Sequence, residues 1–364
     1  MKRAIFLILL VCQFSFAFIN QNDDYEKEIK ILRSLDIDAS FVPTLHYISI
    51  KNSVEDKRLI RDYIGILKKG YAFIPTLQKM IEEAGVPTSF LYLAMAESNF
   101  SPKARSRRRA GGIWQFMPRT ARKMGLKINK YIDERFDPVK STKAAISYLQ
   151  TLHQRFKKWY LVAIAYNCGE GKLAKAIKEA GTDDLSVLLD DERKYIPKES
   201  RDYIRKILTM AHIAENTDLI VKNSASFLLN RSKSDYLHKV TIKGGVNLKK
   251  LAKRCQLTYK EFKFYNPHIR KDLIPRKIKK CDIYLPYQKY IAYKQNGYLR
   301  YAQAKRVKHK RYKRKKRHIR YRVKKGDTLF HIARKFKTPV KKIKLANNMR
   351  TSFLKIGKSI VIPR

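Results

Sequence analysis

The stretch Phe90–Pro118, FLYLAMAESNFSPKARSRRRAGGIWQFMP, decides the fold. It opens with a run of almost only apolar residues, which predicts a helix buried in a helical core. Ser98 and Asn99 follow at once, with Pro102 behind them, and are expected to end the helix. Glu97 therefore stands at the mouth of a core helix. Partial burial there is expected to raise its pKa and keep it protonated near neutral pH, as a general acid requires.

A glutamate near a helix end is more often a solvated surface residue, so the position of Glu97 alone does not establish catalysis. The residues that follow favour a ligand site. Gly111 and Gly112 would let the backbone approach a ligand closely. The segment WQFMP at 114–118, with Gln115 and Met117, would then supply a flat apolar wall with one amide, on which a sugar ring can stack.

Five spaced blocks of sequence resemble a known family. They are AMAESNFSPKA (94–104), AGGIWQFMPRTA (110–121), RFDPVKSTKAAISYL (135–149), AIAYNCGEG (163–171) and YIPKESRDYIRK (195–206). Together they resemble the lytic transglycosylases of the goose-type lysozyme superfamily, specifically the membrane-bound lytic murein transglycosylase D branch. The chain departs from the family at Cys168, where a small alanine is usual, and cysteine packs as a small hydrophobe.

The resemblance implies roles for particular residues. It makes Glu97 the only catalytic acid and base. The family positions that line the saccharide groove fall on Gln115, Tyr166, Asn167, Glu199 and Tyr203, and the candidate set is completed by Ser98, Ser106 and Met117. Neither a metal nor a cofactor is expected.

Plainer interpretations of these residues stay open. A Tyr166–Asn167 pair at a helix end is ordinarily structural, whereas in the family its polar ends face the sugar N-acetyl group. Glu199 and Tyr203 are four residues apart and therefore share one face of a helix. In the structural interpretation, Glu199 caps the helix and Tyr203 belongs to the core. In the interpretation that the family favours, both line the saccharide groove and Tyr203 lies close to Glu97.

The loop at 105–109 has four arginines around Ser106. It is either a solvated turn or an approach path for the peptide carboxylates of murein. Further on, Asp137-Pro138 is expected to cap a scaffold helix that runs through Leu152.

The N-terminus resembles a secretory signal peptide over residues 1–17. Lys2 and Arg3 precede an apolar run, and Ser15-Phe16-Ala17 offers small residues for cleavage. Cys12 raises a lipoprotein alternative, which Val11 and the short apolar run disfavour. We expect export to the periplasm or cell envelope, where the protein is peripheral on the wall or membrane.

The 364 residues have a formal net charge of +50, and 44% of them are hydrophobic. Such a basic surface is expected to bind polyanions. After export these would be anionic lipids, wall polymers or lipopolysaccharide. The basic tract alone would permit nucleic-acid binding, but the signal peptide and the absence of a stacking-aromatic motif oppose it.

The C-terminal part changes to short mixed segments. Residues 321–364 resemble the LysM module, a strand-helix-helix-strand binder of N-acetylglucosamine polymers. In the module, Gly326-Asp327-Thr328 opens the first helix and Thr338-Pro339 the second. Sugar binding would fall to the loop after Gly326, with Asp327 and Thr328, and to the loop around Asn347.

Residues 236–288 repeat this pattern as a degenerate copy. Leu248, Leu251, Ala252 and Cys255 take the places of Leu329, Ile332, Ala333 and Phe336. Cys255 would leave a gap that a disulfide with Cys281 could compensate, and two unrelated free cysteines are the alternative. Residues 289–320 are expected to form a basic linker. The tract AKRVKHKRYKRKKRHIRYRVKK at 304–325, which begins in this linker and runs into the LysM module, has no acidic residue.

The expected architecture is a mainly α, lysozyme-like catalytic domain at 76–222, preceded by a helical region at 18–75 and followed by small α+β (βααβ) LysM modules. The expected activity is non-hydrolytic cleavage of the MurNAc-β-1,4-GlcNAc bond of peptidoglycan, which leaves 1,6-anhydroMurNAc ends. A hydrolytic muramidase and a non-catalytic wall-binding adaptor are the alternatives.

Overall fold

The computed structural model describes residues 25–229, 231, 235–295 and 318–363. The chain divides into two units, residues 1–304 and 305–364. The predicted signal peptide at 1–17, which contains Cys12, and residues 296–317 of the predicted basic linker lie outside the described residues. No helix in the described ranges is long and apolar enough to cross a membrane.

The first unit begins with helices that share the core of the predicted catalytic domain. Residues 25–33 are helical, and the next elements are η1 (Ala39–Phe41), α2 (Leu45–Ser53), α3 (Lys57–Gly70) and α4 (Ile74–Glu83). Leu32, Tyr47 and Phe73 are buried in one hydrophobic cluster with Phe90. The helical region predicted at 18–75 therefore has no core of its own in its described part.

α5 (Phe90–Ser98) ends as the sequence predicts. Asn99 takes the left-handed conformation with φ 51°, and its backbone N–H donates to the carbonyl of Met95. Asparagine tolerates this conformation better than most residues, which makes it a good helix terminator. Glu97 is thereby fixed in the last turn of α5.

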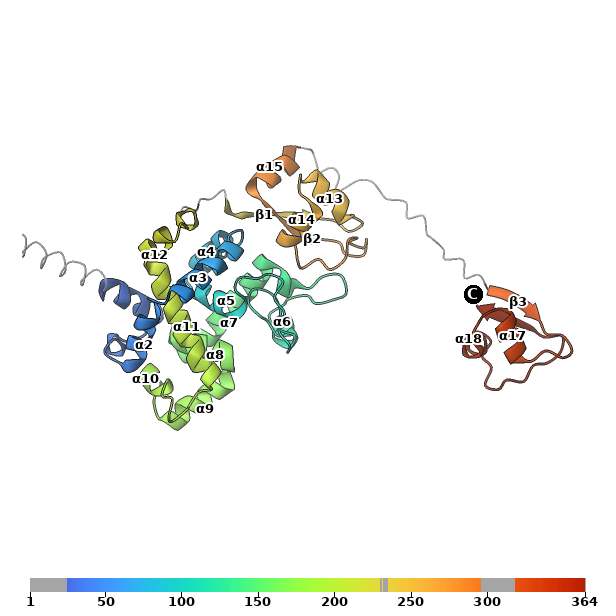
Figure 1. The fold of residues 1–364 in the computed structure, drawn as a ribbon, viewed down its shortest axis with the longest axis horizontal. Helices are drawn as coiled ribbons and strands as arrows, with labels where there is room; N and C mark the ends of the chain where they lie inside the picture. Colours follow the sequence, from blue (N-terminus) through green and yellow to red (C-terminus); the bar gives the residue numbers. More distant parts are fainter. Residues whose placement is uncertain (1–24, 230, 232–234, 296–317, 364) are drawn as a thin grey trace, which may run out of the picture. The chain divides into compact units, whose positions relative to one another are not determined.

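The remaining helices of this domain complete a layered helical bundle around α5 (Figure 1). They are α6 (Pro118–Lys123), η2 (Glu134–Phe136), α7 (Pro138–Phe156), α8 (Trp159–Cys168), α9 (Glu170–Ala180), α10 (Leu185–Leu188), α11 (Lys198–Glu215), α12 (Thr217–Lys222) and η3 (Ser226–Leu228). Asp137 caps α7 as expected, because its carboxylate accepts the N–H groups of Val139 and Lys140.

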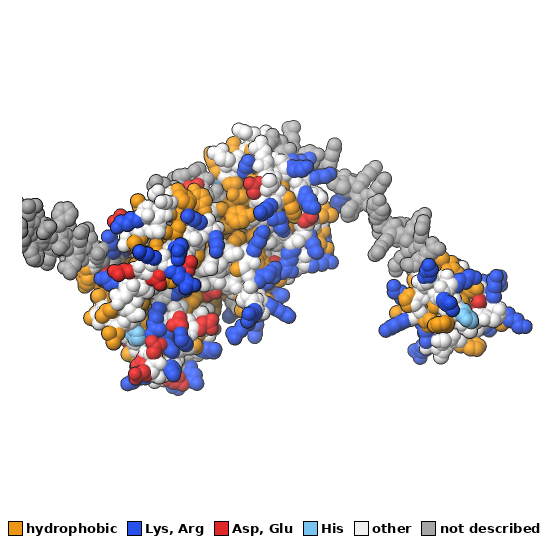
Figure 2. Space-filling model, in the orientation of Figure 1, with side chains coloured by type: hydrophobic (Ala, Val, Ile, Leu, Met, Phe, Trp, Pro, Cys, Tyr) orange, Lys and Arg blue, Asp and Glu red, His pale blue; other side chains and the backbone are white. Residues whose placement is uncertain are grey.

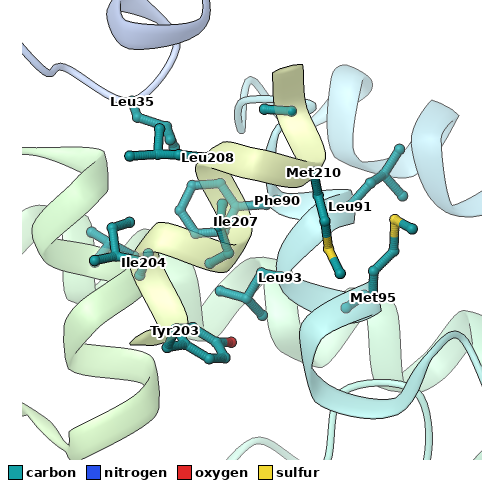
Figure 3. Close-up of a cluster of buried hydrophobic side chains, with 14 of the residues drawn as sticks. Leu35, Phe90, Leu91, Leu93, Met95, Tyr203, Ile204, Ile207, Leu208 and Met210 are labelled. Carbon is teal, nitrogen blue, oxygen red and sulfur yellow. The ribbon is translucent and has the colours of Figure 1, made fainter. Parts of the chain in front are cut away.

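α11 packs its apolar face against α5 in the middle of this core (Figure 3). Ile204, Ile207 and Leu208 of α11 are at most 1% exposed, as is Leu93 of α5. Tyr203 lies at one end of this row, beyond Ile204, and its hydroxyl oxygen points toward α5. Burial of such residues stabilises the pair by about 1.5–3 kcal/mol for each side chain, so the spacing between the two helices is firmly set.

A small module follows in the same unit, with β1 (Leu237–Ile242), α13 (Leu248–Arg254), α14 (Tyr259–Tyr265), β2 (Cys281–Pro286) and α15 (Tyr287–Gln295). β1 and β2 pair antiparallel, with Val240 opposite Ile283. Residues 289–295, assigned to the basic linker from sequence, instead extend α15, and Tyr293 is buried in the core of the module.

The second unit has the same order of elements: β3 (His318–Arg322), α17 (Leu329–Lys335), α18 (Val340–Ala346) and β4 (Ser359–Pro363). β3 and β4 pair antiparallel, with Arg320 opposite Val361. Thr328 caps α17 by accepting the N–H of His331, and Pro339 precedes α18. The predicted strand-helix-helix-strand order is confirmed.

One asparagine in each module makes the same three hydrogen bonds. The amide of Asn347 donates to the carbonyls of Ile343 and Val361 and accepts the N–H of Val361. Asn266 bonds in the same way to Phe262 and Tyr284. Each amide thus ties the second helix to the last strand, which supports the assignment of both segments to one fold.

The disulfide predicted between Cys255 and Cys281 is wrong for this structure, in which both are free cysteines. Both side chains lie in the core of the first small module, which leucine, isoleucine and phenylalanine residues fill. Burial raises the pKa of each thiol to about 12. Cys255, which takes the place of Phe336 of the second module, is therefore packed among apolar side chains and is not bridged to Cys281.

Candidate active site

Glu97 meets Tyr203 across the α5–α11 interface. The hydroxyl of Tyr203 donates a 2.8 Å hydrogen bond to Oε1 of Glu97. The predicted proximity of these two residues is confirmed. Tyr203 is 8% exposed and Glu97 is partly buried, so the bond lies at the edge of the core.

Burial raises the pKa of Glu97 to about 7. The hydrogen bond from Tyr203 and the charge of Lys206 lower the pKa, and the charge of Glu199 raises it, but burial is the largest cause. Near neutral pH both forms of the carboxyl group are therefore populated. A group in this condition can donate a proton and take one back.

Lys206 is a member of this site that the sequence analysis missed. It follows Tyr203 by three residues on α11, so the two side chains lie on neighbouring positions of one helix face. Desolvation lowers the pKa of Lys206, and the charge of Glu97 opposes this shift. The spacing was a usable signal, since the block YIPKESRDYIRK contains both residues.

Tyr166 and Asn167 lie in the last turn of α8, which ends at Cys168. The hydroxyl of Tyr166 donates to the backbone carbonyl of Trp114 over 2.7 Å, and Oδ1 of Asn167 accepts the hydroxyl of Ser200 over 2.7 Å. Both polar ends thus support neighbouring segments of the site. The sugar contacts expected for them stay predictions.

The apolar wall predicted at 114–118 is wrong for its two aromatic residues. Trp114 is 0% and Phe116 3% exposed, so both rings belong to the core. The indole N–H of Trp114 donates to the hydroxyl of Thr142 over 2.8 Å. Met117, at 43% exposed, remains open to a ligand. Gln115 lies between the two buried rings, and its amide donates to the carbonyl of Gly112 over 2.8 Å.

Gly112 is required by the protein's own backbone rather than by an approaching ligand. A Cβ atom at Gly112 would lie 1.8 Å from the backbone oxygen of Arg135, and φ there is 81°. At Gly111 a Cβ atom would lie 2.7 Å from the ring of Phe136. The two glycines therefore let the segment around Gln115 pack on residues 135–136.

The other candidates lie around this centre. The Ser98 hydroxyl donates to the carbonyl of Ala94 over 3.2 Å, within α5. The Ser106 hydroxyl accepts the N–H of Ala110 over 3.0 Å and closes the exposed arginine loop. Glu199 is exposed in the first turn of α11 and acts on Glu97 through its charge.

In the second unit the predicted sugar-binding residues organise their own loops. The carboxylate of Asp327 accepts the hydroxyl of Tyr321 and the N–H of Lys324. Gly326 has φ 89°, which allows the turn before Thr328. A groove on this unit is lined by Val340, Lys341, Lys344, Leu345, Asn348, Met349 and Arg350.

No group of three or more His, Cys, Asp or Glu residues that could hold a metal ion occurs within residues 25–229, 231, 235–295 and 318–363. Lys and Arg side chains are spread across the visible face of the first unit, and fewer acidic side chains are interspersed (Figure 2).

Three segments of the chain match known protein families. Residues 76–188 match the transglycosylase SLT domain, which contains Glu97. Residues 236–301 match the LysM-like domain of lytic transglycosylase MltD, and residues 321–363 match the LysM domain. The chain carries a transglycosylase SLT domain and two LysM-type domains. The strand-helix-helix-strand modules and the helical domain around Glu97 are therefore of the predicted classes.

The chain is homologous to the membrane-bound lytic murein transglycosylase D of Escherichia coli K12. The two are 32% identical over 191 residues, which cover 52% of this chain and 41% of that protein. The peptidoglycan transglycosylase gp16 of Escherichia phage T7 is 31% identical over 159 residues, which cover 43% of this chain and 11% of that protein. This chain thus spans about two fifths of the Escherichia coli relative.

Among solved structures, the lytic transglycosylase Slt of Pseudomonas aeruginosa is similar at 26% sequence identity and a TM-score of 0.33. The match covers 42% of this chain and 24% of that chain. The SLT match ends at residue 188, so Tyr203 and Lys206 on α11 lie beyond it.

Proposed function

We propose that this protein is a peptidoglycan lytic transglycosylase that cleaves the MurNAc-β-1,4-GlcNAc bond without water. The observation that carries the proposal is the Tyr203–Glu97 hydrogen bond, which holds a carboxyl group of pKa about 7 at the edge of an SLT domain. Its homologues are named for murein transglycosylase activity.

In the first step Glu97, in its protonated form, donates its proton to the glycosidic oxygen. The bond between C1 of the muramic acid and that oxygen breaks, and the GlcNAc side leaves as an alcohol. Positive charge develops at C1. We assign the stabilisation of that charge to the carbonyl oxygen of the substrate's own N-acetyl group. Glu199, whose charge raises the pKa of Glu97, is exposed in the first turn of α11 and is given no role as a nucleophile.

In the second step Glu97 is an anion and accepts the proton of the muramic 6-hydroxyl. The 6-oxygen then bonds to C1 and closes a 1,6-anhydro ring, while the N-acetyl oxygen is released. The proton that Glu97 gave away in the first step is regained in the second. Atoms balance without a water molecule.

Tyr203 and Lys206 stabilise the anionic form that Glu97 takes between the two steps. The phenol hydroxyl donates to the carboxylate, and the ammonium group lowers the pKa of Glu97 through its charge. Burial acts in the opposite direction. The balance leaves the two protonation states of Glu97 close in free energy, which suits a group that must serve as acid and then as base.

The partner is the glycan of peptidoglycan, which would bind at Glu97 and at the LysM domain. We place the protein in the cell envelope, peripheral on the wall or membrane, where its charge of +50 would favour anionic wall polymers or lipids. Lipidation at Cys12 is the less favoured route to the membrane.

The test is the substitution Glu97→Gln, which keeps the shape of the side chain and can still accept the Tyr203 hydroxyl but cannot deliver a proton. Release of soluble fragments from purified sacculi is expected to fall by at least about 1,000-fold. Glu179→Gln, on the exposed face of α9, is the matched control and is expected to keep full activity. Near-normal turnover by Glu97→Gln would refute the mechanism, and no turnover by the wild type would favour a wall-binding adaptor.

A further inference from the structure

The first small module is joined to the SLT domain by backbone and core contacts. Ile132 of the SLT domain pairs with Ile269 in an antiparallel β-bridge and is buried in the core of the module. The N–H of Asp133 donates to the carbonyl of His268, and the N–H of Arg270 donates to the carbonyl of Tyr131. The module is therefore docked along residues 131–133.

A buried ion pair follows on the SLT side of this junction. Asp133 is 0% and Arg135 4% exposed. Two nitrogens of the Arg135 guanidinium donate to the two carboxylate oxygens of Asp133, over 3.0 and 2.9 Å. This bidentate geometry fixes the orientation of the guanidinium plane.

The third nitrogen of Arg135 holds the loop that carries Gln115. It donates to the backbone carbonyls of Arg109 over 2.6 Å and of Phe116 over 3.2 Å. Gly112 packs directly on the backbone oxygen of Arg135. Arg135 thus clamps both arms of the loop at 109–116, with Gln115 between them.

Arg270 of the small module completes the clamp from outside the SLT domain. Its guanidinium donates to Oδ2 of Asp133, one of the two oxygens that also accept from Arg135, and to the backbone carbonyl of Asn129 over 3.0 Å. Asp133 therefore lies between one arginine of each domain. A carboxylate buried to this degree depends on such partners.

We propose that Arg270 is a positioning residue for the active-site loop at 109–116. It acts through Asp133 and Arg135, so the first LysM-like module is a fixed part of the catalytic unit and not a separately tethered sugar binder. The proposal rests on the proposed function only for its kinetic consequence. Its structural consequence can be measured without any substrate.

Hydrogen exchange of the full-length protein is the primary test. The N–H groups of Arg109, Gly111 and Gly112 are bonded within the loop and its neighbours. In Arg270→Ala these amides are expected to exchange roughly 10-fold faster, while those of α9 are unchanged. Lys271→Ala removes a neighbouring exposed cation and is expected to leave the loop unchanged. Unchanged exchange at 109–116 in Arg270→Ala would overturn the proposal.

A kinetic cycle separates positioning from general destabilisation. On purified sacculi, Arg270→Ala is expected to lose about 10-fold to 100-fold in kcat/KM, and Lys271→Ala to lose nothing. If Arg270 acts through the loop, adding Arg270→Ala to Gln115→Ala costs little more than Gln115→Ala alone. Multiplicative losses in the double variant would contradict this route.

Failure of the proposed function and failure of the role proposed for Arg270 give different results in these experiments. If the wild type has no turnover, the proposed function fails, and the exchange experiment still decides the role of Arg270. If Arg270→Ala does not fold, Arg270→Lys takes its place. Lysine keeps the charge beside Asp133 but cannot span Asp133 and Asn129 as a guanidinium does, so faster loop exchange is again expected. Wild-type exchange in Arg270→Lys, together with an unfolded Arg270→Ala, would overturn the loop-positioning role.

Discussion

The hydroxyl of Tyr203 donates a 2.8 Å hydrogen bond to Oε1 of Glu97, from a residue 106 positions further along the chain. The apolar faces of α5 and α11 pack together (Figure 3). This packing brings the Tyr203 and Glu97 side chains within hydrogen-bonding distance. It connects the stability of the helical core directly to the protonation state of the catalytic candidate.

Tyr203→Phe is expected to shift the alkaline limb of the pH profile of kcat/KM to higher pH. The hydrogen bond favours the anionic form of Glu97 and lowers its pKa, so its loss raises that pKa above about 7. Because activity needs the acid form first, the protein stays active further into the alkaline range. The rate at the optimum should fall about 10-fold, since the anionic form is less well held.

The matched control for this change is Tyr160→Phe. Tyr160 is also a buried tyrosine, and its hydroxyl donates to the carbonyl of Asp183. The variant should keep the wild-type pH profile. An alkaline limb that moves to lower pH in Tyr203→Phe would show that the hydroxyl does not stabilise the Glu97 anion.

Glu97→Gln is expected to be more stable than the wild type at pH 8. The pKa of Glu97 is about 7 in the folded protein against an ordinary value of 4.5, so the folded state binds more protons than the unfolded state between these values. Wild-type stability therefore falls as pH rises from about 4.5 to 7 and is level above. The difference should reach about 1–3 kcal/mol.

Thermal or denaturant unfolding at pH 4, 6 and 8 measures this effect. The stability gained by Glu97→Gln should be small at pH 4 and largest at pH 8. A gain that is independent of pH would mean that Glu97 has an ordinary pKa.

The sequence was sufficient for most of the elements and for the place of Glu97 at the end of a core helix, because apolar runs, caps and spaced blocks are local signals. Asp137 at the start of α7 and Thr328 at the start of α17 cap as expected. The burial of Trp114 and Phe116 was missed, because a short aromatic segment has the same composition in a sugar-binding wall and in a core.

The contacts between domains could not be predicted for a further reason. Arg270 and Asp133 are 137 positions apart, and no periodic pattern relates them. Cys255 and Cys281 were predicted to form a disulfide, whereas in the structure both are free thiols that fill space in one hydrophobic core.

Thr142→Val is expected to destabilise the protein by about 1–3 kcal/mol. Thr142 is buried, and its hydroxyl accepts the indole N–H of Trp114 and donates to the carbonyl of Pro138. Valine keeps the volume but leaves the buried indole N–H without an acceptor. Denaturant unfolding measures the change.

Thr151→Val is the control on the same helix. Its hydroxyl also donates to the carbonyl four residues earlier, but Thr151 is exposed. Its effect should stay within about 0.5 kcal/mol. Equal effects of the two variants would mean that the indole bond adds nothing to stability.

Asn347→Ala is expected to destabilise the second unit by about 2–3 kcal/mol, because three hydrogen bonds between α18 and β4 are lost. Faster hydrogen exchange in β4 should report it. Asn348→Gly is the control, since Asn348 is exposed with φ 53°, which glycine adopts freely. Unchanged β4 protection in Asn347→Ala, with loss of chitin-oligomer binding, would assign Asn347 to sugar contact instead.

The most direct test of the account is mass analysis of the soluble products released from purified sacculi by the wild-type protein. If Glu97 closes the ring as proposed, the muramic ends are 1,6-anhydro and each product is one water lighter than its hydrolytic counterpart. Products that end mainly in reducing muramic acid would show that water attacks C1, and would replace the transglycosylase mechanism with that of a hydrolytic muramidase.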